Sequence, residues 1–146
     1  TYARVRPEVL QIELHPLLTQ ENLVRYAHEE GLVVTAFSSL GSPSYVPLQM
    51  AEASESLLTH PTVTDIASKV GKTPAQVLLR WAIERKLVII PKTTSPQRLA
   101  ENISLFDFQL DVKQVAAISA LNSNRRSNDP ADFGERAFNT FCPIYD

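Results

Sequence analysis

Near its amino terminus the chain reads Val9-Leu10-Gln11-Ile12-Glu13-Leu14. Apolar and polar side chains alternate there, which predicts a β-strand with its three leucine and isoleucine side chains on one face. Gln11 and Glu13 then point to the opposite face. In an open doubly wound sheet, helices cover both faces and the strands are apolar throughout. In a (β/α)₈ barrel, polar groups near the carboxyl ends of the strands face the active-site mouth. The alternation therefore favours part of a barrel over an open sheet.

Strands and helices alternate along the rest of the chain. We expect strands at 9–14, 32–37 and 87–91, and helices at 19–30, 62–70, 73–85, 96–105 and 111–121. This order predicts parallel βαβ units in an α/β fold. Three strands alone leave two unpaired sheet edges. Thr1 has no Met before it, so we expect a piece of something longer.

Several helix boundaries carry local signals. Capping boxes pair Thr73 with Gln76 and Asp111 with Gln114, and Gly71 is suited to end the helix before them. Thr19 is predicted to cap the helix at 19–30. Its inward-facing residues are expected to be Leu23, Tyr26 and Ala27.

Two segments lack regular periodicity. Residues 38–60 form a loop rich in Ser, Pro and Gly, with a short helix expected near 50–58. A loop of this length in a compact domain is usually functional, often as a lid. Residues 122–146 are predicted to be an extended tail.

The helix expected after residue 95 begins in an unusual way. Ser95 is a cap and Pro96 the first helical residue, but the third position, which favours Glu or Gln, holds Arg98. Lys92 lies just before, at the strand end. Two cations beside a helix N-terminus are unfavourable unless an anion neutralises them, and a phosphate group would do so. Glu101 and Asn102 share the helix face of Arg98. The alternative is a solvated basic helix start with Glu101 as the intrahelical partner of Arg98.

Composition narrows the classes of partner. The chain has 146 residues, 44% hydrophobic residues and a formal net charge of −2, which gives no reason to expect nucleic acid or a membrane surface as a partner. No apolar run approaches the roughly 20 residues of a spanning helix. The single Cys142 excludes an internal disulfide and fits a reducing, cytoplasmic location. We interpret it as a small apolar residue rather than a reactive thiol.

Four motifs together carry a family resemblance. They are Gln11-Ile12-Glu13-Leu14-His15-Pro16, Thr35-Ala36-Phe37-Ser38-Ser39-Leu40-Gly41-Ser42-Pro43, Lys72-Thr73-Pro74-Ala75-Gln76-Val77-Leu78-Leu79-Arg80-Trp81 and Ile90-Pro91-Lys92-Thr93-Thr94-Ser95-Pro96-Gln97-Arg98-Leu99-Ala100-Glu101-Asn102. In order and spacing they resemble the C-terminal half of an aldo-keto reductase of the aldose and xylose reductase branch. Asn128-Asp129-Pro130 resembles the xylose-reductase tail.

The resemblance implies a fold and a cofactor. Residues 1–121 would be the C-terminal part of a (β/α)₈ barrel, and residues 122–146 the loop that walls the substrate pocket, with Asn128 in that wall. NADPH would bind at the barrel mouth. At the adenosine end, Lys92, Thr93 and Arg98 match positions that hold its 2′-phosphate, and Glu101 and Asn102 match adenine contacts. In the middle, Ser38, Leu40 and Ser42 match the loop over the pyrophosphate. At the nicotinamide end, Gln11 matches the contact of the carboxamide, and Phe37 matches the aromatic residue on which the nicotinamide ring stacks.

The same resemblance implies that the chain lacks the family's catalytic residues. The family's catalytic Tyr, with its Lys, His and Asp, comes from the first half of the barrel, and no residue here matches those positions. His15 is interpreted as structural, His28 and His60 as surface residues, and no metal site is expected. Ser127 and Ala131 depart from the xylose-reductase pattern, where aromatic residues are usual, so the resemblance does not specify the substrate.

Three functions remain open from the sequence. The first is the cofactor-binding half of an NADPH-dependent reductase acting on aldehydes or ketones (aldoses or other small carbonyls), with the missing N-terminal half as its partner. The second is an NADPH-binding regulatory module without turnover. The third is an unrelated open α/β domain that binds a phosphorylated ligand, which the polar side chains of Gln11 and Glu13 disfavour.

Overall fold

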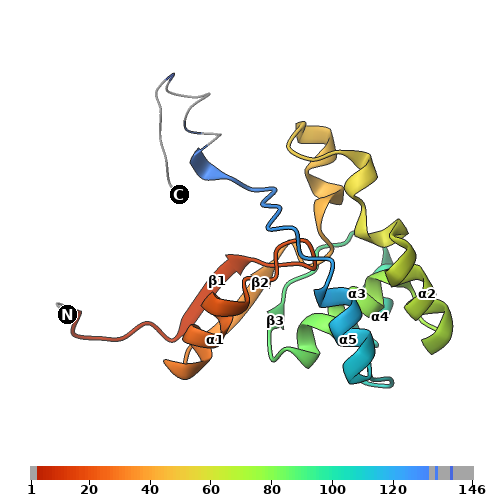
Figure 1. Ribbon diagram of the computed structural model, residues 1–146, viewed down its shortest axis with the longest axis horizontal. Coiled ribbons are helices and arrows are strands. Elements are labelled where there is room, and N and C mark those ends of the chain that lie inside the picture. The colour runs from red at the N-terminus through yellow and green to blue at the C-terminus, as the bar shows by residue number, and fades with distance from the viewer. Residues whose placement is uncertain (1–2, 132–133, 135–138, 140–146) are drawn as a thin grey trace.

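A three-stranded parallel sheet organises the structure. The computed structural model describes residues 3–131, 134 and 139, so Cys142 lies outside the described residues. The strands β1 (Val9–Glu13), β2 (Val33–Phe37) and β3 (Val88–Ile89) lie in the order β1-β2-β3, and every neighbour pair is parallel (Figure 1). The predicted strands and the α/β class are confirmed. The ladder between β2 and β3 is short, because only Thr35 and Ala36 of β2 pair with it.

The two faces of this sheet have opposite environments. On one face, Leu14, Val34 and Ala36 are fully buried. On the other face, the described residues leave apolar side chains in solvent, with Val9 57% and Val33 48% exposed. The predicted two-faced strand is therefore confirmed, and helices of the described chain cover one face of the sheet only.

Five α-helices follow the predicted order. They are α1 (Glu21–Glu29), α2 (Pro61–Val70), α3 (Pro74–Glu84), α4 (Pro96–Ile103) and α5 (Val112–Ser119). The capping boxes at the starts of α3 and α5 form as predicted, Ser95 caps α4, and Gly71 ends α2 with φ +66°. No helix of the described chain is long and apolar enough to cross a membrane.

The start and the inner face of α1 differ from the prediction. The cap is Gln20 in a left-handed conformation, not Thr19. Thr19 is held instead by distant groups, since its N–H donates to Asn122 Oδ1 and its carbonyl accepts from Arg85 Nη2. Val24 and Ala27 are the buried residues of α1, while the predicted inward residues Leu23 and Tyr26 are exposed. At the start of α1, the contacts with Asn122 and Arg85 therefore outweigh the local capping preference of Thr19.

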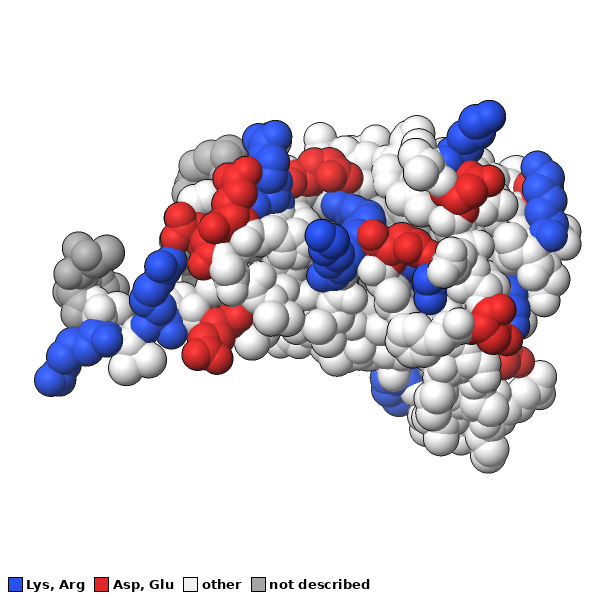
Figure 2. Space-filling model, turned by 90° about the horizontal axis from the view of Figure 1, so that it is seen from below, with Lys and Arg blue, Asp and Glu red and all other residues white. Residues whose placement is uncertain are grey.

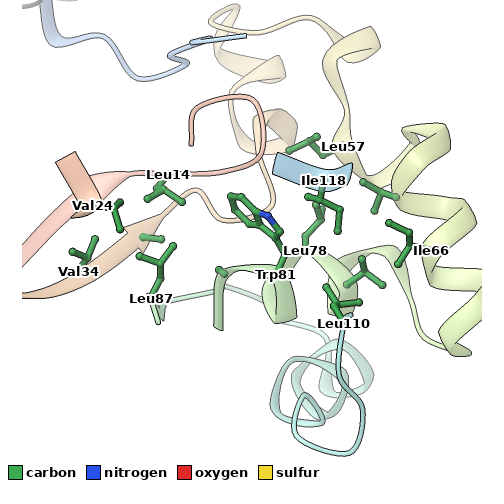
Figure 3. Packing of buried hydrophobic residues seen from close by; sticks show 14 of the residues in the cluster. Leu14, Val24, Val34, Leu57, Ile66, Leu78, Trp81, Leu87, Leu110 and Ile118 are labelled. Atoms are coloured by element: carbon green, nitrogen blue, oxygen red, sulfur yellow. The ribbon is translucent and has the colours of Figure 1, made fainter. Parts of the chain in front are cut away.

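Trp81 joins the strands to the helical layer. Its ring is fully buried between Leu14 and Leu87 on the strand side and Leu78 and Ile118 on the helix side (Figure 3). The indole Nε1–H donates to Ser119 Oγ at 3.0 Å, so its polar atom is satisfied despite burial. One continuous core therefore holds the sheet, α2, α3 and α5 in a fixed relation.

Residues 38–60 contain four short 3₁₀ helices. They are η1 (Ser42–Ser44), η2 (Val46–Leu48), η3 (Ala53–Glu55) and η4 (Leu57–Thr59). Two of them, η3 and η4, lie at the short helix expected near 50–58. Gly41 has φ +78°, and a Cβ there would lie 2.7 Å from Leu57 Cδ1. His60, predicted as a surface residue, caps α2 through its Nδ1. The loop is thus a packed structure above the carboxyl ends of the strands (Figure 1).

Candidate functional site

A pocket of about 370 Å³ lies where α4 begins. It contains six of the residues predicted to bind NADPH: Leu40, Lys92, Thr93, Arg98, Glu101 and Asn102. Thr73, Pro74 and Ala75 at the start of α3 form another wall, and Leu58 of the loop completes it. Residues far apart in sequence therefore line one pocket, and six of them are residues that the family resemblance implied.

Two cations, Lys92 and Arg98, line this pocket. Among the described residues, neither Lys92 nor Arg98 forms a salt bridge, although six other pairs do. Glu101 Oε1 accepts from Gln97 Nε2 at 3.1 Å, so the alternative of an intrahelical Arg98–Glu101 pair is not formed. Lys92 and Arg98 are exposed beside a helix N-terminus, an arrangement suited to a phosphate group.

Hydrogen bonds fix the walls of the pocket. Buried Gln76 donates through Nε2 to the carbonyls of Glu101 (3.2 Å) and Ser104 (2.9 Å), which ties α4 to α3. The Ser95 N–H donates to Thr93 Oγ1, and the Arg98 N–H to Ser95 Oγ. The segment bearing Lys92 and Arg98 is thereby held before any ligand arrives.

The remaining predicted cofactor residues lie along the strand ends and the loop, outside this pocket. Gln11 is exposed on the uncovered sheet face, and Phe37 is half-buried opposite Glu13 in the ladder. Ser38 has φ +56°, and its Oγ is hydrogen-bonded to the Tyr45 hydroxyl at 2.6 Å. Ser42 is 2% exposed, and its Oγ has no partner among the described residues. These side chains therefore extend the site away from the pocket toward the sheet.

A buried carboxylate at the end of β1 was missed by the sequence analysis. Glu13 is 1% exposed, although its polar character and strand position predicted a side chain at an open mouth. Its Oε1 accepts from the Ser127 N–H (2.8 Å) and from His15 Nε2 (2.9 Å), and its Oε2 accepts from the Asn128 N–H (3.0 Å). The tail thus crosses the strand end and covers Glu13. The motif around residues 11–16 contained both side chains, but nothing local showed their distant partners.

A second carboxylate holds the same tail. Glu55 in the loop accepts from Arg125 Nε at 2.6 Å, and Arg125 Nη2 donates to the Met50 carbonyl at 3.1 Å. The hydrogen bond from Arg125 is the main cause that lowers the pKa of Glu55. A cavity of about 610 Å³ lies beside this pair and contains none of the predicted site residues. The loop and the tail are therefore joined directly.

We expect the tail contact at Glu13 to weaken in acid. Burial alone would raise the pKa of Glu13, but the hydrogen bonds from His15, Ser127 and Asn128 outweigh it and the pKa lies below its ordinary value. A depressed pKa means that the stabilisation is fully present above about pH 4.3 and is lost as pH falls through the folded value. The positive charge of Arg125 also interacts with this carboxylate.

The measurement for this prediction is amide hydrogen exchange at Ser127 and Asn128 as a function of pH, corrected for intrinsic rates. Their protection should fall in acid before that of Val34 in the core. Loss of protection at all three amides together would show that Glu13 does not control the tail separately.

Comparison with known proteins gives a consistent result. The model of the aldo/keto reductase family matches residues 1–123. The chain is 55% identical over 131 residues to a probable NAD(P)H-dependent D-xylose reductase of Aspergillus clavatus, covering 88% of this chain and 40% of that protein. It is 50% identical over 146 residues to the NAD(P)H-dependent D-xylose reductase of Aspergillus niger, covering 99% of this chain and 44% of that protein.

Solved structures resemble the chain over a similar share. A Bombyx mori aldo-keto reductase in complex with NADP has a TM-score of 0.78 and 38% identity, over 92% of this chain and 43% of that one. An aldo-keto reductase from a Medee basin deep-sea metagenome library has a TM-score of 0.75 and 32% identity, over 86% and 43%. The chain thus spans about two-fifths of the length of its relatives.

Proposed function

The chain belongs to the aldo/keto reductase family, and from this membership we propose that it is the C-terminal, cofactor-binding part of a (β/α)₈ barrel that reduces aldehydes or ketones with NADPH. Residues 1–121 would form the barrel part and residues 122–146 the wall of the substrate pocket. Aldoses and other small carbonyl compounds are the proposed substrate class, in keeping with the D-xylose reductase relatives. A cytoplasmic location is part of the proposal and rests on the single cysteine.

The observation that carries this proposal is the sheet with one covered face. The exposed face holds Val9, Val33 and Val88, and the outer edges of β1 and β3 have no strand partner among the described residues. Such a face and such edges are buried when further strands close a barrel. This arrangement supports a larger barrel as the working unit of the chain.

A second exposed apolar surface also supports the proposal that further strands and helices of a barrel pack against this chain. Beside β3 and α4 an apolar hollow of about 560 Å³ is lined by exposed Leu99, Ile103 and Phe106 together with Val88 and Ile89. Isolated apolar side chains at a protein surface are ordinary, but a contiguous group around an unpaired strand marks a contact surface. We propose that the N-terminal half of the barrel covers it.

The chain's own residues fit NADPH. Lys92 and Arg98 lack ion-pair partners among the described residues, and the buried Ser42 Oγ has an unused hydrogen-bonding capacity. On the face seen in Figure 2, acidic and basic side chains are interspersed rather than gathered in one large basic area. Recognition of a phosphorylated nucleotide needs cationic side chains at the pocket itself, and Lys92 and Arg98 line it.

We propose that each group of these residues contacts a different part of NADPH. Lys92, Thr93 and Arg98 would hold the 2′-phosphate, and Glu101 and Asn102 would contact adenine. Ser38, Leu40 and Ser42 would line the pyrophosphate, while Gln11 and Phe37 would orient the nicotinamide at the strand ends. Bound NADPH supplies a hydride for the carbonyl carbon. The acid that protonates the carbonyl oxygen would come from the N-terminal half.

Phe37→Ala should lower turnover in the complete barrel more than it lowers the melting temperature. The ring is only half-buried, so one face remains for stacking while the core loses little. Steady-state kinetics and thermal unfolding measured on the same preparation separate the two effects. Val34→Ala is the matched control, because Val34 is fully buried on the other face of β2 and should lower stability instead. A large stability loss with normal turnover for Phe37→Ala would make Phe37 a core residue.

A further inference from the structure

Burying the Glu13 carboxylate at the end of a strand costs desolvation free energy. Both its carboxylate oxygens are removed from solvent, and an apolar residue of similar size would generally stabilise such a position at least as well. The carboxylate nevertheless accepts three hydrogen bonds, with at least one on each oxygen: two from backbone N–H groups and one from an imidazole. A buried charge that is hydrogen-bonded at both oxygens fixes the geometry of the groups that donate to it.

The hydrogen-bond donors to Glu13 show that it fixes the backbone of the tail at residues 127–128. The N–H groups of Ser127 and Asn128 are consecutive, and they lie 114 and 115 residues away in sequence. Each carboxylate oxygen accepts one of them, so Glu13 holds the two consecutive peptide groups on either side of the Ser127 Cα. The Asn128 side chain is exposed and is the proposed residue of the substrate wall.

Other contacts fix Glu13 itself. Gln20 Nε2 donates to the Glu13 carbonyl at 2.6 Å, and the backbone of Leu14 donates to the Phe37 carbonyl at 3.2 Å. Two residues earlier on the same face of β1 lies Gln11, the proposed contact of the nicotinamide. Strand β1 therefore carries both the proposed cofactor contact, Gln11, and the carboxylate that accepts hydrogen bonds from the tail, Glu13.

We propose that Glu13 is a positioning residue that sets the place of Asn128 relative to the nicotinamide site, and thereby the binding of the carbonyl substrate. This inference rests on the proposed function. Glu13 acts through the backbone of the tail and touches neither the substrate nor the cofactor. Its removal should leave NADPH binding intact and weaken substrate binding.

The test uses a complete barrel, made by joining this chain to the preceding segment of the Aspergillus niger D-xylose reductase. In Glu13→Gln, the carboxamide keeps the shape but has one acceptor oxygen and no charge. We expect exchange at the Ser127 and Asn128 amides to accelerate roughly tenfold or more, because hydrogen bonds to a buried charge are lost. The KM for a small aldose should rise severalfold, with the Kd of NADPH changed by less than about twofold.

Two further variants keep the test decisive. Glu55→Gln removes the other carboxylate that holds the tail through Arg125 but leaves both N–H donors in place, so exchange at Ser127 and Asn128 should stay near that of the unmodified barrel. Ser127→Pro removes one donor while Glu13 remains, and should reproduce the rise in KM even where Glu13→Gln fails to fold.

The outcomes separate this inference from the proposed function. An unmodified barrel that binds no NADPH overturns the proposed function, whereas the exchange rates at Ser127 and Asn128 still report the contact with Glu13. Equal acceleration in Glu13→Gln and Glu55→Gln, or a uniform loss of protection that includes Val34, would assign Glu13 a general structural role and overturn the inference. An unchanged KM with faster exchange would overturn it as well.

Discussion

The 146-residue chain by itself should oxidise no measurable NADPH with any aldehyde, and adding the N-terminal segment of the Aspergillus niger relative should restore turnover. Two physical reasons lead to this expectation. In the described part of the chain, one sheet face is exposed and the outer edges of β1 and β3 have no strand partner, so the proposed barrel is incomplete. We also propose that the catalytic Tyr comes from the N-terminal segment, and enzymes owe rate accelerations of roughly a millionfold or more to complete sites.

The measurement is NADPH absorbance with a panel of small aldehydes and aldoses, for the chain alone, the segment alone and their mixture. A mixture in which the segment's catalytic Tyr is replaced by Phe is the control, because it restores the barrel without the acid. Turnover by the chain alone would contradict the proposed division of the site. A mixture that binds NADPH without any turnover would instead favour the regulatory module.

Arg98→Ala should weaken NADPH binding by tenfold or more and leave NADH binding nearly unchanged. The guanidinium has no ion-pair partner among the described residues and lines the pocket with Lys92, and we propose that it holds the 2′-phosphate. A charge-assisted bond of this kind contributes about 1.5–3 kcal/mol. Only NADPH carries the extra phosphate, so the loss should be selective.

Fluorescence titration of the complete barrel with each cofactor checks this prediction. Lys113→Ala is the control, since it removes one exposed cation of α5 that does not line the pocket. Equal losses for NADPH and NADH would remove the 2′-phosphate role from Arg98. A similar loss in Lys113→Ala would show a general effect of net charge rather than a contact.

The parts of the fold that follow from short-range physics were predictable. The capping pair of Thr73 and Gln76 lies within a single turn, so the four residues from the cap to its partner contain the whole signal. The pocket around Arg98 was predictable in the same way, because Lys92 and Arg98 share one strand-to-helix connection. Motif resemblance added Leu40, which no local rule connects with that helix.

The parts that failed depend on contacts across the chain. Thr19 has the right chemistry for a cap, but Asn122 and Arg85 take its backbone groups. Glu13 was expected beside solvent because strand periodicity reports the face and not what covers it. The cover is the tail at residues 127–128, and no window of sequence around Glu13 contains it.

The distance between Glu13 and its tail donors also sets an order of assembly. A ribosome that adds about 5–20 residues per second needs roughly 6–23 s to travel from Glu13 to Asn128, 115 residues later. All residues of the cation-lined pocket have been synthesised before the tail exists. During translation the residues of the proposed nucleotide pocket can therefore come together while Glu13 still lacks its tail donors, so the proposed substrate wall is added after the pocket.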